Sequence, residues 1–416
     1  MHCVSLLLQG VVMSTQASAT ARASGPIKLT NGLIALFAFC CGAIVANLYY
    51  AQPITELIAP DIHMSGGTAS LIVSLTQIGY AFGLFFLVPL GDLLENRKLM
   101  IATALVSIAS LAAAAFAHQP GAFLVISLLV GFSSVAVQIL IPLAAHLAPD
   151  ESRGKVVGTI MSGLLLGILL SRPISSVVAG HFGWRAVFGS AAVLMAIVTT
   201  VLALTIPRRQ PDHQATYFEL IGSLGRLVRT MPVLRHRSLY QALMFASFSL
   251  FWTAIPVELT RHFGLTQTQI GIFALVGAIG ATSAPVAGRL ADAGHTVRAT
   301  LIALVVGALA YAPTLIHPAW GVAGLVATGI VLDFAVQMNM VLGQREIYAL
   351  DATSRNRLNA LYMTSIFVGG ALGSALASPL YEHGGWPLVA AVATAFPLIA
   401  LAHYLMIGRP HAARHS

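Results

Sequence analysis

Apolar runs of roughly 20 residues alternate with short polar segments along almost the whole chain, and a helix of this length crosses a hydrocarbon core of about 30 Å. Glycine, proline and charged residues mark the breaks between the runs. The pattern therefore predicts an all-α membrane protein with twelve membrane-spanning helices. We place these spans at 32–53, 69–91, 98–117, 121–144, 157–180, 185–206, 238–258, 269–290, 297–316, 319–343, 358–379 and 386–407.

The longest polar segment between spans, residues 207–237, predicts a boundary between two halves. It contains six arginines, and six predicted spans lie on each side of it. We expect an N-terminal half at 31–206, a cytoplasmic loop at 207–237 and a C-terminal half at 238–408. Residues 1–30 and 409–416 are expected to be cytoplasmic tails, the first of them disordered.

The first residues of the chain do not resemble a signal peptide. The stretch His2–Met13 is mildly apolar, but it is too short to span a membrane and lacks a basic start. Translation from Met13 instead of Met1 stays an open alternative.

Lysine and arginine are distributed very unevenly between the two sides of the predicted helices. Of 22 such residues, 19 lie in segments on the side of the two termini, and only Arg185 and Arg261 lie on the other. Cytoplasmic segments of membrane proteins are enriched in these residues. The pattern predicts that both termini and the 207–237 loop are cytoplasmic in a bacterial inner membrane.

The composition excludes several classes of protein and of binding site. The chain is 57% hydrophobic and 9% charged, with a mean hydropathy of +0.84, which does not fit a soluble domain. The net charge of +8 is spread over short segments between spans, so we exclude a nucleic-acid partner. Three cysteines and scattered histidines give no disulfide framework, metal site or cofactor site.

The two halves carry similar short sequences at corresponding places. Ala136-Val137-Gln138 in the fourth span recurs as Ala335-Val336-Gln337 in the tenth, and Asp92 and Asp292 both follow the second span of their half. Gly183-Trp184 recurs as Gly385-Trp386. Such repetition predicts two pseudo-symmetric six-helix halves with a cavity at their interface.

The loop after the second span of each half resembles the signature of the major facilitator superfamily. Pro89–Lys98 keeps the acidic residue and the basic pair of that signature, and Gly288–Gly294 keeps its first part. The resemblance covers about residues 30 to 408. It implies transport by alternating access, with a latch that stabilises one conformation. The latch residues would be Asp92, Arg97, Lys98, Gly288 and Asp292. The alternative is that these are ordinary loop charges.

Finer motifs are similar to those of bacterial efflux permeases for drugs, sugars and nucleosides. The similarity rests on Asn47–Pro53 and Ser354–Asn359. Gly163–Pro173 in the fifth span keeps only the first two glycines of a motif that drug antiporters often carry. The resemblance therefore implies efflux without identifying the solute.

Asp333 is an acidic residue in the middle of the tenth span. An ionised carboxylate there costs at least about 2.5 kcal/mol to insert, so Asp333 must face protein or water. Gln337 and Met340 follow it on the same helical face. Because burial favours proton uptake by a carboxylate, Asp333 is our candidate for proton coupling. A structural role as a buried, hydrogen-bonded carboxylate is the alternative.

Arg172 is the one basic residue inside a predicted span. It needs an anion or several carbonyl groups to be tolerated there. We treat it as the second candidate for proton coupling, with a substrate carboxylate or phosphate as one possible partner. A permanent pair with an acidic residue, or a side chain that reaches toward the membrane surface, would be structural alternatives.

Uncharged polar residues at helical spacing could bind a solute or join helices. The predicted cavity residues of this kind, together with the two from the tenth span, are Asn47, Tyr50, Gln77, Tyr80, Ser134, Gln138, Gln337 and Met340. Pairs of glycines four residues apart, such as Gly79 and Gly83 or Gly163 and Gly167, predict close helix packing instead.

These features favour a secondary active transporter, because the chain has no phosphate-binding loop for ATP. We predict proton-coupled efflux of a small organic solute by a monomer in the lipid bilayer. An uptake carrier or a uniporter of the same fold is the alternative within this class. A membrane-embedded enzyme or a channel is the alternative outside it. The enzyme would need clustered catalytic acids or histidines, which we do not find.

Overall fold

The computed structural model describes residues 30–149, 151–207, 216–316, 318–351 and 354–407. The predicted tails at 1–29 and 409–416 lie outside these ranges. Every regular element in the described ranges is a helix. The prediction of an all-α membrane protein is therefore confirmed.

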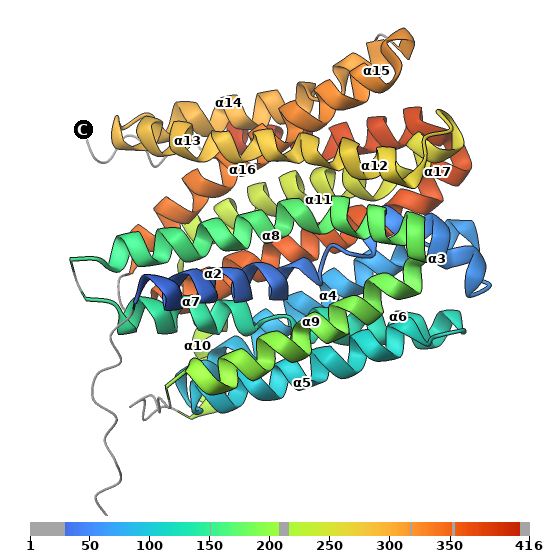
Figure 1. Ribbon diagram of the computed structural model, residues 1–416. Helices are drawn as coiled ribbons and strands as arrows, with labels where there is room; N and C mark the ends of the chain where they lie inside the picture. Colours follow the sequence, from blue (N-terminus) through green and yellow to red (C-terminus); the bar gives the residue numbers. More distant parts are fainter. Residues whose placement is uncertain (1–29, 150, 208–215, 317, 352–353, 408–416) are drawn as a thin grey trace, which may run out of the picture.

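The N-terminal half runs from α2 to α9 (Figure 1). Its elements are α2 (Asn31–Ala46), η1 (Gln52–Ile54), α3 (Thr55–Asp61), η2 (Gly66–Thr68), α4 (Leu71–Phe86), η3 (Val88–Asp92), α5 (Asn96–Ala115), α6 (Pro120–Ser133), α7 (Ala136–Leu147), α8 (Arg153–Phe182) and α9 (Trp184–Thr205).

A connecting helix and the C-terminal half follow. Their elements are α10 (Tyr217–Thr230), α11 (Pro232–Arg261), α12 (Gln267–Ala274), η4 (Leu275–Thr282), α13 (Ser283–Asp292), α14 (Thr296–Leu309), α15 (Ala312–Ile316), η5 (Pro318–Trp320), α16 (Gly321–Leu350) and α17 (Arg355–Ile407).

Ten helical stretches of the described residues are long and apolar enough to cross a membrane. The apolar helix α2 adds a shorter candidate at the first predicted span. The 53-residue α17 joins two helices across Gly385, whose backbone is not helical (φ 60°, ψ −159°). The arrangement is consistent with twelve spans.

The prediction of one continuous helix over 32–53 is wrong. The α-helix ends at Ala46, and the next amides of Asn47, Leu48 and Tyr49 donate to carbonyl groups three residues back. Pro53, which has no N–H group, lies directly beyond them in η1. The eighth span is also interrupted, because η4 separates α12 from α13. Both breaks place irregular backbone beside the site described below.

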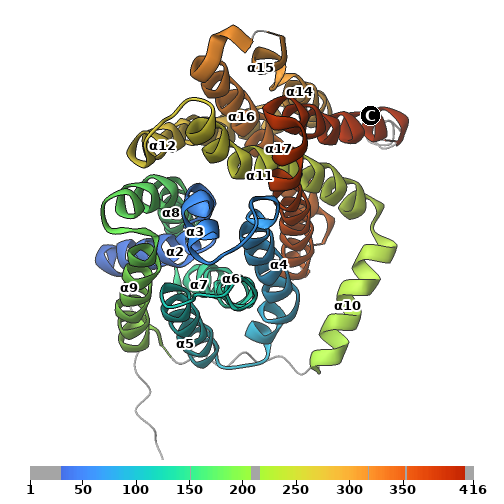
Figure 2. The ribbon, with the colours of Figure 1, turned by 90° about the vertical axis from the view of Figure 1, so that its right-hand side faces the viewer.

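The two halves form separate groups of helices when viewed along the bundle (Figure 2). They meet where α4 packs on α17 and where α8 packs on α12. Helix α10 lies beside both groups and begins with a capping box between Thr216 and Glu219. The hydrogen bonds from Thr216 lower the pKa of Glu219.

Within each half, glycines allow neighbouring backbones to approach closely, as predicted. A Cβ atom at Gly79 would overlap the carbonyl group of Leu128, and one at Gly167 would overlap Gly42. The same holds for Gly373 against Ala246 in the other half. Glycines also lie between the halves, because a Cβ atom at Gly271 of α12 would meet Ser176 and Pro173 of α8.

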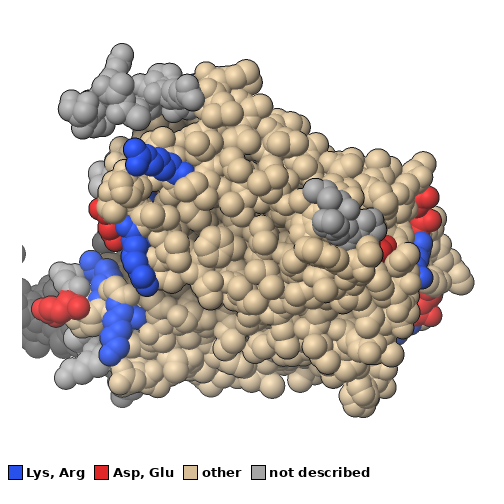
Figure 3. Space-filling view, turned by 90° about the horizontal axis from the view of Figure 1, so that it is seen from above, with Lys and Arg blue, Asp and Glu red and all other residues tan. Residues whose placement is uncertain are grey.

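Charged side chains gather at the two ends of the molecule, with a broad band of other residues between them (Figure 3). We call the end with α3 and Arg261 the distal end, and the opposite end, where α2 begins and α17 finishes, the termini end (Figure 1). The band between them is the surface expected to face lipid.

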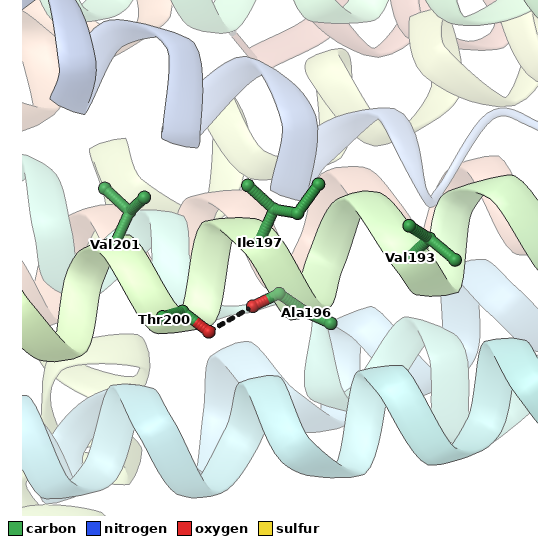
Figure 4. A pocket seen from close by; sticks show the side chains of 5 residues that line it. All are labelled: Val193, Ala196, Ile197, Thr200 and Val201. Atoms are coloured by element: carbon green, nitrogen blue, oxygen red, sulfur yellow. Dashed lines mark hydrogen bonds between the residues drawn. The ribbon is translucent and has the colours of Figure 1, made fainter.

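A shallow hollow on the outer face of α9 lies in this band (Figure 4). Its lining comes from this helix alone: Val193, Ala196, Ile197, Thr200 and Val201. Val193 and Ile197 are more than half exposed, and Thr200 donates to the Ala196 carbonyl of its own helix. The hollow therefore offers no converging polar groups for a solute, and its character is that of a lipid-facing surface.

Candidate functional site

Arg172 lies in α8, at the surface where the N-terminal half meets the C-terminal half. Its side chain is buried, with 5% exposed. The Nε atom donates a 2.8 Å hydrogen bond to Oε1 of Gln52, which the broken first span places beside α8. Three aromatic rings surround the guanidinium: its central carbon lies 4.6 Å, 4.9 Å and 5.7 Å from the ring centroids of Trp252, Tyr49 and Phe248. These distances are those of cation–π contacts.

Asp333 lies in α16 of the C-terminal half and is 4% exposed. Its Oδ1 atom accepts a 2.9 Å hydrogen bond from Nε1 of Trp252. The 3₁₀ segment η4 packs directly on it: a Cβ atom at Gly277 would lie 2.9 Å from Oδ2, and one at Gly280 would lie 2.7 Å from the Asp333 Cβ. The two glycines therefore make the room that this carboxyl group occupies.

Trp252 of α11 links the two predicted charges. One side of its indole faces the Arg172 guanidinium, and its N–H group binds Asp333. A second contact runs beside it, because Gln52 donates a 3.2 Å hydrogen bond to Oγ1 of Thr253. The structure thus brings the two candidates together across the two halves, with an aromatic ring between them instead of an ion pair.

An aromatic row extends from this site along the interface. Phe245, Phe248 and Trp252 lie on one face of α11, with ring centroids 5.1 Å and 6.3 Å apart. Phe367 of α17 continues the row, 5.5 Å from Phe245 and 4.5 Å from Tyr80. The row joins the predicted cavity residue Tyr80 to the Arg172 site.

Three of the predicted cavity residues line the interface or its edge. Gln77 donates a 2.8 Å hydrogen bond to Ser249 of the other half, and Gln138 donates a 3.2 Å hydrogen bond to the hydroxyl of Tyr80. The Oε1 atom of Gln77 is buried and has no partner among the described residues.

Other predicted cavity residues contact their own half. Asn47 donates to Ser107 at 3.5 Å, and Ser134 donates to the Val130 carbonyl of its own span. Tyr50 is buried, and its carbonyl accepts from Ser175. The contacts of Asn47 and Tyr50 join neighbouring segments of the N-terminal half, whereas that of Ser134 stays within its own span.

In the tenth span, Gln337 and Met340 are half-buried, and Met340 packs on the core. Between them on the helix, Asn339 donates a 2.6 Å hydrogen bond to Gln241 of α11. This buried pair was not predicted. It joins α16 to α11 on a different face of the helix from that of Gln337.

The second copy of the predicted latch is assembled around an arginine. Nη2 of Arg345, in α16, lies 2.5 Å from Oδ1 of Asp292, and Nη1 donates to the Gly288 carbonyl at 3.1 Å. Both predicted residues of α13 therefore contact one side chain of the tenth span.

The first copy of the predicted latch differs from the second. Lys98 pairs with Glu95 at 3.3 Å, while Asp92 at the end of η3 and Arg97 in the first turn of α5 are half-buried. Arg345 lies beyond residue 343, where we predict the tenth span to end, so the sequence indicates only a loop charge there.

Contacts at the distal end hold the two halves together. Arg261 of α11 pairs with Glu56 of α3 at 2.8 Å and with Glu382 of α17 at 2.7 Å. We call the Arg261–Glu56 pair, together with the reciprocal backbone-to-hydroxyl bonds of Ser70 and Ser378, the distal gate. The bonds of the gate are short and cross the interface, so this end is closed in the structure.

The distal end also carries an ion pair within the N-terminal half. Arg185 and Trp184 both donate to Asp61. These bonds, the one from Arg185 first, hold the pKa of Asp61 below its ordinary value. Arg185 and Arg261, the two basic residues predicted on this side, therefore both have carboxylate partners.

No group of three or more His, Cys, Asp or Glu side chains among the described residues could hold a metal ion. Several site residues escaped prediction, namely Gln52, Trp252, Glu56 and Arg261. A signal existed for Trp252 and Glu56, because a tryptophan or a glutamate inside or next to an apolar run is unusual.

Comparison with known proteins agrees with the fold. The sequence model of the Major Facilitator Superfamily matches residues 33–342 and 237–416. The chain is 40% identical over 387 residues to the uncharacterized transporter YgaY of Escherichia coli O157:H7, covering 91% of this chain and 95% of that protein. The chain belongs to this superfamily of membrane transporters. It is a transporter and not an enzyme, and its substrate is a small molecule.

Solved structures of transporters share the fold. The nucleoside transporter NupG superposes with a TM-score of 0.70 at 14% identity, covering 90% of this chain and 99% of that one. A bacterial homologue of the human lysosomal transporter Spinster gives a TM-score of 0.71 at 14% identity, covering 90% and 95%.

Proposed function

We propose that this protein is a secondary active transporter that couples the efflux of a small organic solute to protons by alternating access. The observation that carries the proposal is the placement of Arg172 and Asp333. They come from opposite halves, are both buried, and flank the same indole ring. Movement of one half against the other must change the surroundings of both charges.

Asp333 is the group that we propose to exchange protons. Its carboxyl group contacts Trp252 and the 3₁₀ segment η4, whose Gly277 and Gly280 pack directly on it. A carboxyl group that faces one side of the membrane when protonated and the other side when deprotonated couples proton movement to the movement of the two halves.

The distal gate gives the proposed cycle a defined starting state. Closure at Arg261 and Glu56 directs access to the site toward the termini end, which the charge distribution predicts to be cytoplasmic. A solute loaded from that side leaves after the gate opens. The Arg345–Asp292 contact at the termini end would stabilise the second half during this step.

Uptake with protons is a second candidate, because the two site charges have opposite signs. When Asp333 is protonated, Arg172 is the remaining charge, and an anionic solute then binds more favourably. Proton and solute would in this case move in the same direction. Efflux in exchange for protons requires the opposite: a bound proton must weaken solute binding, and a bound solute must weaken proton binding.

Proteoliposomes that contain a trapped pH dye separate these cases. Naphthalene-2-sulfonate, naphthalene-2-sulfonamide and 2-naphthylmethylammonium are added outside in turn, with protein-free liposomes as the control. Exchange makes the interior alkaline as solute enters, and symport makes it acidic. Asp333→Asn is expected to abolish the pH change while solute still moves. Solute flux that never moves protons in the wild type would contradict proton coupling.

A further inference from the structure

We infer that the transported solute is an organic anion with a flat apolar body, whose anionic oxygens bind Arg172. This inference rests on the proposed transport by alternating access, and it adds the chemical class of the substrate. Because an anion binds Arg172 best when Asp333 is protonated, it favours the second candidate above, in which proton and solute move in the same direction. It is carried by the surroundings of the Arg172 guanidinium, which is walled by aromatic rings and has no counter-ion in the described part of the chain.

Although the buried Asp333 lies close enough to interact with its charge, Arg172 forms no ion pair with any described residue. Its Nη2 atom is buried without a hydrogen-bond partner in the described part of the chain. Gln52 accepts a hydrogen bond from the Nε atom of Arg172 alone, and the nearby carboxyl group of Asp333 accepts its hydrogen bond from Trp252. A buried guanidinium without an anion is costly, so an anion from outside the chain fits this position.

The contrast with Arg237 shows that this chain can neutralise a buried arginine. Arg237 is equally buried, and the Glu346 carboxylate accepts from its Nε at 2.6 Å and from its Nη2 at 2.5 Å. Thr300 accepts from its third nitrogen at 2.8 Å. Such a two-point bond is the geometry that arginine offers to carboxylate and related oxyanions. Arg172 has the same group, and no described carboxylate binds it in this way.

The aromatic walls define the rest of the solute. Tyr49, Phe248 and Trp252 present ring faces to the guanidinium, and Phe245 extends the surface. Flat apolar groups stack on such faces, whereas a sugar would need many more donors and acceptors than the row provides. A cationic solute would meet the charge of Arg172. The walls therefore select an anion that carries a ring or another flat apolar group.

Both halves would contact this solute. Arg172 and Gln52 belong to the N-terminal half, and Phe248 and Trp252 belong to α11 of the C-terminal half. A ligand held between the two halves binds one arrangement of them better than the other, as a transported solute must.

Calorimetric titration of the purified full-length protein in detergent tests the inference without requiring transport. The probes are naphthalene-2-sulfonate and its neutral match, naphthalene-2-sulfonamide, with inorganic sulfate as the anion without a ring. We expect the sulfonate to bind at least about tenfold more tightly than the other two. Arg172→Gln is expected to remove this preference, whereas Arg172→Lys keeps part of it. Arg298→Gln, an exposed arginine of α14, is the matched control and should leave binding unchanged.

Equal binding of sulfonate and sulfonamide, no binding of either, or a preference that survives in Arg172→Gln would overturn the inference. A thermal melt of each variant confirms that it is folded. Because binding is measured at equilibrium, a failure here is separate from a failure of proton coupling. The sulfonate could bind through Arg172 in a protein whose Asp333→Asn variant still moves protons, and that outcome would remove only the proposed coupling.

Discussion

Trp252 and Asp333 are joined by a 2.9 Å hydrogen bond from the indole Nε1 to the carboxyl Oδ1, within the C-terminal half. The same indole lies 4.6 Å from the guanidinium of Arg172 in the other half. One side chain therefore contacts both the Asp333 carboxyl group and the guanidinium of the opposite half.

Replacement of Trp252 by Phe separates these two contacts. The ring surface beside Arg172 is largely kept, but the donor to Asp333 is lost. We expect Trp252→Phe to bind naphthalene-2-sulfonate within about threefold of the wild type, because a buried hydrogen bond outside the ligand contributes little to stacking. Proton movement per solute in proteoliposomes should fall. Phe248→Leu, which removes a ring but no donor, is the control. It should weaken the binding of naphthalene-2-sulfonate and leave proton movement per solute unchanged.

Removal of the Glu56 charge should open the distal end. Glu56→Gln leaves Arg261 paired with Glu382 of its own half, so only the contact between the halves is weakened. A change of about 1–2 kcal/mol shifts a two-state population by about 5- to 30-fold. The measurement is the rate at which a membrane-impermeant maleimide labels Ser374→Cys in a background without the native cysteines. Ser374 is a buried residue of α17 whose hydroxyl bonds to carbonyl groups of its own helix, so the reporter leaves the gate bonds intact.

Glu382→Gln is the matched control for this experiment, because it breaks the other bond of Arg261, which lies inside the C-terminal half. Labelling should rise in Glu56→Gln and stay near the starting value in Glu382→Gln. Equal labelling of the two variants would show that the gate does not depend on the contact between halves.

The Arg345–Asp292 pair should affect transport without affecting stability. Its side chains are 46% and 69% exposed, and pairs of this kind contribute about 0–1 kcal/mol to stability. If the pair acts as a latch, Asp292→Asn slows solute flux several-fold at an unchanged melting temperature, and binding of naphthalene-2-sulfonate stays the same. Loss of stability with unchanged flux would instead assign the pair a structural role.

Close packing of α8 on α2 predicts a different kind of defect. A methyl group at Gly167 overlaps the backbone of Gly42, so Gly167→Ala should lower thermal stability by roughly 1–3 kcal/mol. Gly158 lies on the same helix, and a methyl group added there would meet no described atom within 4 Å. Gly158→Ala should therefore be neutral or slightly stabilising. Melting curves in one detergent compare the two, and equal melting temperatures would contradict the packing argument.

The helical spans and their grouping into halves were predictable because lipid imposes a simple rule. Every backbone group in the hydrocarbon must be satisfied within its own helix, so length and hydropathy are nearly sufficient. The rule fails where the chain lines the interface. Beyond the break after Ala46, the Tyr50 carbonyl accepts from Ser175 of α8, and η4 packs on Asp333 of α16. Hydropathy reports neither contact.

Asp333 and Arg172 were recognisable in the sequence because a charge inside a span is costly wherever it lies. The sequence did not indicate that the two residues meet at one site. In the aligned repeat of the fourth and tenth spans, Asp333 occupies the place of Ser134, so the duplicated pattern itself carries no acidic residue. The site is an asymmetric addition to a symmetric scaffold.

By itself, the sequence determined the membrane, the two halves and the two buried charges, since each follows from the cost of placing polar groups in hydrocarbon. The tertiary structure alone decided which side chains meet. Gln52 meets Arg172 because the broken first span passes beside α8, and Trp252 meets both charges because α11 packs on α16 while its indole faces Arg172 of α8. Contacts between residues so far apart in the chain depend on helix packing, and no local pattern encodes them.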